Sequence, residues 1–198
     1  MLGAFSVIDF RKFMFFDNDL RITYLMKGEA MLWCGVEKVG FMKTFITNTL
    51  GTGRTKEITI TNPQIPLFPV TLKLIRASLS TIYWEAQIHG ANLETVQIRY
   101  IQESVFRKEV CILTYKGMDV MRTGRSFAQI LVSPRRRFTA VIESGPPFAH
   151  SAKFLTINRG WADTPSLVFG LTSDPLCNSL VLALSQVYDC EQTFETSL

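Results

Sequence analysis

The chain has few histidines and no closely spaced cysteines. Its 198 residues contain two histidines, His89 and His150, and four scattered cysteines. A structural zinc site normally shows close ligand pairs such as C-x-x-C, and this chain has none. Widely separated cysteines in a chain of this length are typical of reduced, buried thiols in the cytosol. We therefore expect neither a metal ion nor any other cofactor.

Sequence motifs of catalysis are also scarce. Neither histidine lies in a G-x-S-x-G or cysteine-protease signature. The D-x-D spacing of Asp17 and Asp19 lacks the glycine and the distant glutamate of a calcium loop, which favours a polar turn. We expect a protein that is not an enzyme. The alternative is an enzyme with His89 or His150 beside Cys111 or a carboxylate in a cleft.

Long apolar runs are missing. No stretch approaches the roughly 18 to 20 apolar residues of a membrane-spanning helix. The apolar run at the start of the chain is interrupted by Asp9 and Arg11, which makes a poor signal peptide. We expect a cytoplasmic protein that is not secreted and has no transmembrane helix, with peripheral contact to a membrane left open.

The composition predicts a folded, mildly basic protein. Hydrophobic residues make up 47% and charged residues 19% of the chain, enough for a packed core. The formal net charge is +4, which favours RNA, DNA or anionic lipid as a partner without demanding one. An ordinary basic domain is the alternative interpretation.

Alternating apolar residues and frequent turn signals predict a mainly β (α+β) fold. We expect an antiparallel β-sandwich or jelly-roll-like core, with a barrel as the other architecture of such short strands. Apolar residues at helical spacing predict an early amphipathic helix over 37–50 and a second helix from Pro175 to about Tyr188, docked on the sheet. Expected strands cover 20–26, 56–61, 70–78, 82–88, 95–101, 110–115, 127–132, 138–143, 153–157 and 166–171. We expect one domain over 1–198, with an N-terminal strand and helix (1–55), a β core (56–172), a C-terminal helix (173–189) and a frayed tail (190–198).

One cluster of cations predicts a binding surface. If neighbouring strands form hairpins, several arginines converge on one edge of the sheet and neutralise phosphates there. Lys73 and Arg99 lie near aromatic residues that can stack bases, although strand aromatics are more often core residues or cross-strand pairs. A solvated, charged sheet edge is the alternative. The candidate nucleic-acid-binding residues are Arg122, Arg125, Arg135, Arg136, Arg137, Arg99 and Lys73.

The last residues, Thr196, Ser197 and Leu198, fit the short carboxyl-terminal pattern that PDZ domains bind. The pattern is too short to decide whether it is a binding motif.

The order of strands resembles the viral cell-to-cell movement proteins. The resemblance is carried by 70–80 (VTLKLIRASLS), 96–115 (VQIRYIQESVFRKEVCILTY) and 138–171, and covers roughly 56–171. The family typically closes its central strand with L-x-D, whereas here Asp119 lies further along the chain. The resemblance implies a jelly-roll-like domain that binds single-stranded nucleic acid, oligomerises and associates with membranes at junctions between host cells.

The chain is also similar to matrix-type proteins of negative-strand RNA viruses in size, mild basicity and lack of catalytic residues. It does not begin with the basic, proline-rich arm that such proteins carry. This second resemblance implies self-association and contact with nucleoprotein and an anionic membrane surface. Neither resemblance implies a small-molecule substrate.

Overall fold

The computed structural model describes residues 20–26, 28–46, 53–78, 80–103, 108–125, 137–148, 151–157 and 165–194. These residues form twelve β-strands and one long α-helix. The elements are β1 (Leu20–Met26), β2 (Glu29–Cys34), β3 (Glu37–Ile46), β4 (Arg54–Ile60), β5 (Val70–Ala77), β6 (Thr81–His89), β7 (Leu93–Glu103), β8 (Lys108–Tyr115), β9 (Met118–Arg125), β10 (Arg137–Ser144), β11 (Ser151–Ile157), β12 (Pro165–Phe169) and α3 (Pro175–Phe194).

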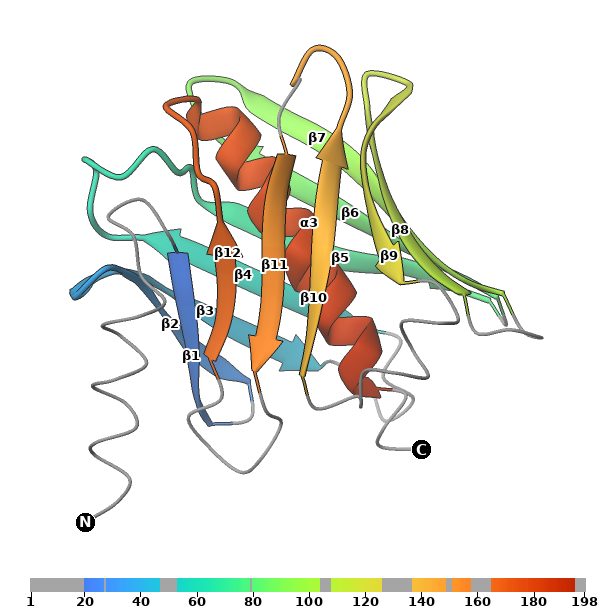
Figure 1. The fold of residues 1–198 in the computed structure, drawn as a ribbon, viewed down its shortest axis with the longest axis horizontal. Helices are drawn as coiled ribbons and strands as arrows, with labels where there is room; N and C mark the ends of the chain where they lie inside the picture. The colour runs from blue at the N-terminus through green and yellow to red at the C-terminus, as the bar shows by residue number, and fades with distance from the viewer. Residues whose placement is uncertain are drawn as a thin grey trace.

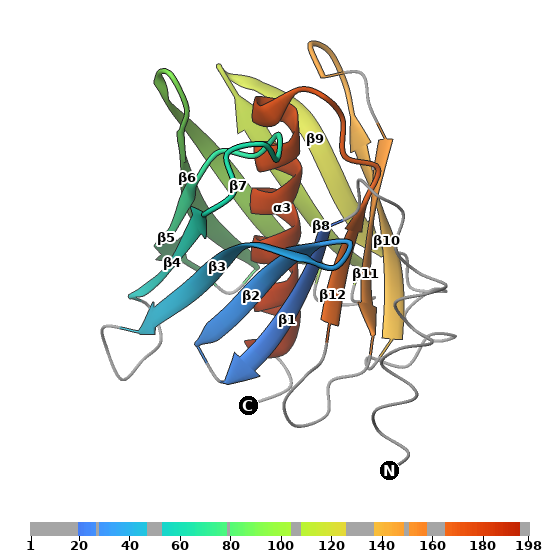
Figure 2. The same cartoon turned by 90° about the vertical axis from the view of Figure 1, so that its left-hand side faces the viewer.

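The strands close into a barrel. Each strand pairs antiparallel with its neighbours in the chain, and β1 pairs with β12 to close the sheet. Figure 1 shows β1, β12, β11 and β10 on one side of α3 and the strands β4 to β8 on the other, and Figure 2 shows the helix enclosed between them. The prediction of a mostly antiparallel β fold is confirmed. The expected sandwich or jelly-roll is wrong, because the described strands form one closed barrel in which every pair except the closing pair β1–β12 joins strands that are consecutive in the chain.

Strand alternation explains the barrel interior. In β6, Trp84, Ala86 and Ile88 are buried and point inward, while the residues between them are partly exposed. The same period of two repeats in neighbouring strands, whose described inward residues form a common core.

The early helix predicted over 37–50 is wrong, because 37–46 is strand β3. Val39 lies at a β-bulge, where the pairing shifts from Trp33↔Lys38 to Leu32↔Gly40. The extra residue changes the parity of the strand, so Val39 and Met42 are both buried although three residues apart. The bulge therefore accounts for the Val39–Met42 spacing that looked helical, whereas Phe45 and Ile46 of the same pattern are exposed.

Two strands are absent from the sequence prediction. Strand β2 has little β-branched content, and β9 contains Gly124 and several charged residues, so neither shows a clear alternating pattern. The strand predicted over 127–132 lies outside the described residues.

The C-terminal helix is longer and more deeply placed than predicted. It begins after Asp174, whose carboxylate accepts a hydrogen bond from Leu176 N at 2.9 Å, and it continues to Phe194. Residues 190–194, which were predicted to belong to a frayed tail, are therefore helical, and 195–198 lie outside the described residues. The helix fills the barrel instead of docking on its outside, and every residue from Cys177 to Glu191 is buried. No helix in the described part of the chain has the length and apolarity needed to cross a membrane.

Candidate nucleic-acid interface

Three arginines lie in one row across the outer face of the barrel. Strand register connects Arg76 to Tyr83, Tyr83 to Arg99, Arg99 to Ile112 and Ile112 to Arg122. Arg76, Arg99 and Arg122 thus lie on alternate strands, β5, β7 and β9. We call these three residues the arginine row. With strands about 4.8 Å apart, neighbouring arginines of the row start from backbones about 10 Å apart.

Arg76 and Tyr83 form a cation–π pair. The Arg76 guanidinium carbon lies 4.3 Å from the centre of the Tyr83 ring, and Arg76 is exposed. Arg76 was not among the predicted binding residues, because the bulge at Ile75 breaks the alternation of β5. A partly exposed ring beside a guanidinium offers both stacking and charge to a ligand.

Arg99 is held by an acidic neighbour. Its Nη2 donates to both carboxylate oxygens of Asp119, at 2.9 and 2.7 Å, and the Thr114 hydroxyl donates to the same carboxylate at 2.6 Å. The hydrogen bond from Thr114, followed by Arg99, lowers the pKa of Asp119. Arg99 is therefore fixed in position, and its charge is largely balanced.

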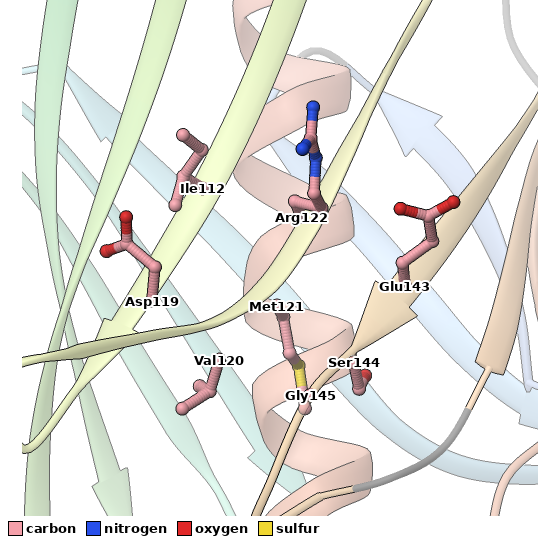
Figure 3. A pocket seen from close by; sticks show the side chains of 8 residues that line it. All are labelled: Ile112, Asp119, Val120, Met121, Arg122, Glu143, Ser144 and Gly145. Atoms are coloured by element: carbon pink, nitrogen blue, oxygen red, sulfur yellow. The ribbon is translucent and has the colours of Figure 1, made fainter.

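Arg122 borders a depression where β9 and β10 separate. Among the described residues, β9 and β10 pair only at Arg122↔Glu143 and Met121↔Ser144. The depression has a volume of about 400 Å³, and Figure 3 shows Arg122 and Glu143 on its two sides, with Ser144 at its edge. The side chains of Arg122 and Glu143 form no ion pair or hydrogen bond with another described residue.

The other predicted binding residues are spread more widely. Lys73 is exposed on β5, with Glu85 directly opposite it on β6. Arg125 is the last residue of β9 and Arg137 the first residue of β10, so their backbones continue along the β9–β10 boundary beyond Arg122. Arg135 and Arg136 lie outside the described residues.

A second group of charges is buried and belongs to the core. Arg54 pairs with Glu191 of α3 at 3.2 Å, Trp84 Nε1 donates to the same carboxylate at 2.8 Å, and Lys56 donates to the Gln186 carbonyl at 3.2 Å. Burial raises the pKa of Glu191, and Arg54 and Trp84 partly oppose that rise. This cluster connects β4 and β6 to the last turns of α3 and is closed to a large ligand.

Of the groups named for the enzyme alternative, the described residues His89 and Cys111 lie apart, one at the surface and one in the core. His89 is exposed at the end of β6, with its ring 3.0 Å from the Thr71 hydroxyl. Cys111 faces the core, where burial raises the pKa of its thiol. His150 lies outside the described residues. Within the described ranges, no group of three or more histidine, cysteine, aspartate or glutamate side chains is arranged to hold a metal ion.

Comparisons of this chain with protein-family models, with curated proteins and with solved structures find no match, so none of them links it to viral movement or matrix proteins.

Proposed function

We propose that this protein is a non-catalytic binding protein whose outer barrel face, at the arginine row, binds single-stranded nucleic acid. The observation that carries the proposal is the register that aligns Arg76, Arg99 and Arg122 on alternate strands beside Tyr83. Single-strand binding uses a row of cations for the backbone and aromatic rings for the bases, and is tolerant of sequence.

The filled interior supports a ligand on the outside. Barrels that bind small molecules usually keep a cavity inside the sheet. Here α3 occupies that space, with side chains such as Leu180, Leu184 and Tyr188 completely buried. A flexible polymer lying across several strands can instead use cations placed about 10 Å apart on the surface.

The charges predict a site of modest affinity. Asp119 neutralises most of the charge on Arg99, and Glu143 lies opposite Arg122. We therefore expect Arg76 and Arg122 to supply most of the salt-dependent contact.

The test is binding of a fluorescent single-stranded RNA of about 12 nucleotides, within the roughly 4 to 16 nucleotides covered by compact single-strand-binding domains. The natural protein is compared across a salt series with a variant that combines Arg76→Gln and Arg122→Gln. Each phosphate contact contributes about −0.7 to the slope of log K against log salt, so the variant slope should be shallower by about 1.4.

The matched control combines Lys38→Gln and Lys43→Gln, which removes the same charge from exposed positions on β3. Its slope should equal that of the natural protein. Equal losses in both variants would show a response to net charge alone. Binding to anionic liposomes without binding to RNA would also overturn the proposal and assign the row to a membrane surface.

A further inference from the structure

The depression beside Arg122 differs chemically from the rest of the arginine row. It lies where β9 and β10 diverge, and its volume of about 400 Å³ is at the small end of the range for ligand pockets. Its lining combines a cation, Arg122, with a carboxylate, Glu143, and the buried apolar residues Val120 and Met121. A site of this size accommodates a single planar group more readily than a long ligand.

The charged side chains on the rim of the depression have no partner among the described residues. The Ser144 hydroxyl oxygen beside them is buried and makes no hydrogen bond with another described residue. Glu143 and Arg122 face each other across the strand pair without an ion pair in the described part of the chain. Gly145 leaves its side of the depression open, since a Cβ there would have only the Val120 carbonyl oxygen for a neighbour, at 4.0 Å.

These groups set the hydrogen-bonding pattern that a ligand must have. A carboxylate accepts two hydrogen bonds from adjacent donors, and a guanidinium donates two to adjacent acceptors. Among the four RNA bases, guanine alone presents two adjacent donors, N1–H and N2–H, beside two adjacent acceptors, O6 and N7. Arginine to guanine O6 and N7 is the commonest specific contact of this kind.

We infer that the depression between β9 and β10 is a pocket for one unstacked guanine base of a bound single strand. Glu143 accepts from N1–H and N2–H, and Val120 and Met121 form the apolar floor. Arg122, which contacts a phosphate when the strand carries no guanine, donates to O6 and N7 when a guanine enters. Single-stranded RNA is commonly read in this way, with a base turned out of the stack into a protein site. The inference rests on the proposed function and adds a base preference to it.

The test compares uridine strands of about 12 nucleotides that carry one central guanosine, inosine, 7-deazaguanosine or uridine. The guanosine strand should bind about tenfold more tightly than the all-uridine strand, as expected for one bidentate base contact. Inosine lacks the N2 amine and 7-deazaguanosine lacks N7, so each should lose part of this preference.

Glu143→Gln should bring the ratio of guanosine-strand to uridine-strand affinity close to one. Glu57→Gln, which removes an exposed carboxylate from β4, should leave that ratio unchanged. Equal affinity of the natural protein for all four strands would overturn the base pocket while leaving the arginine row as a binding site. Failure to bind any strand would overturn both the pocket and the proposed function.

Discussion

At the residue scale, the most constrained charges lie inside the barrel. Glu191 is 2% exposed and receives hydrogen bonds from both Arg54 and Trp84. Removing one partner of a buried pair typically costs 3–5 kcal/mol, roughly, because the other charge stays buried. The same three residues connect two strands to the end of the helix. Because these contacts form only where the end of α3 lies beside β4 and β6, we infer that they fix the position of the helix along the barrel axis.

Glu191 makes a prediction about the pH dependence of stability. Burial raises its pKa in the folded protein, so the folded state binds a proton more readily than the unfolded chain. The stability that this group contributes is complete below its ordinary pKa of about 4.5 and is lost as pH rises through the raised pKa. Glu191→Gln keeps an acceptor for Trp84 and cannot titrate. Urea unfolding of both proteins from pH 4 to pH 8 should therefore show the natural protein losing stability relative to the variant as pH rises.

Parallel pH profiles for the two proteins would contradict this assignment. The variant Glu57→Gln is the control, because its carboxylate is exposed on the outer face of β4.

At the element scale, a single bulge separates the sequence prediction from the structure of β3. Local spacing cannot distinguish a helical turn from a strand with one extra residue, because both place apolar side chains three residues apart. Gly40 carried a usable signal. A glycine inside the predicted helix is unfavourable, whereas in the strand it allows the backbone of β4 to approach closely.

Because the backbone of β4 lies so close to Gly40, we expect this position to tolerate no side chain. A Cβ added there would lie 2.2 Å from the Thr59 carbonyl oxygen of the paired strand. Gly40→Ala should lower the free energy of unfolding by about 1–3 kcal/mol, as overpacking does in well-packed sites. Gly145→Ala is the matched control, with its nearest neighbour at 4.0 Å, and should change stability by less than about 0.5 kcal/mol. Denaturant midpoints would measure both, and equal losses would contradict the packing that we describe.

The helix α3 shows a second limit of local patterns. An apolar stripe of Leu176, Leu180, Val181, Leu184 and Val187 predicts a helix with one buried face, yet both faces are buried. The sequence carries the reason, because 175–188 contains no charged residue. Several buried polar side chains near the start and middle of the helix have hydrogen-bond partners. Asn178 Nδ2, for example, donates to the carbonyls of Pro66 and Thr172 at 2.7 and 2.8 Å.

At the scale of the whole molecule, alternation predicts most strands but not their closure. The bounds of β1 match the prediction, and the strands β4 to β8 are found with small shifts at their ends. Alternation identifies the inward face of each strand but contains no information on whether the last strand pairs with the first. The expectation of a sandwich followed from that missing information.

The arginine row, like the closure of the barrel, was only partly predicted from local sequence patterns. The sequence prediction includes Arg99 and Arg122 but does not align them with Arg76 on β5. Equal spacing along the chain, at residues 76, 99 and 122, was the available signal. In an up-and-down barrel, two strands and two turns return the chain to the same level, so an equal interval brings these residues into one row.

The most direct test of the arginine row is to identify which residues a bound single strand touches. We would irradiate the natural protein with a 4-thiouridine-containing RNA of about 12 nucleotides and locate the cross-linked peptides by mass spectrometry. The account predicts cross-links at Tyr83 and on β7 and β9, and their loss when Arg76 and Arg122 are both changed to Gln. Cross-links concentrated on β2 and β3, around Phe41 and Lys43, would contradict it and place the binding face on the other side of the barrel.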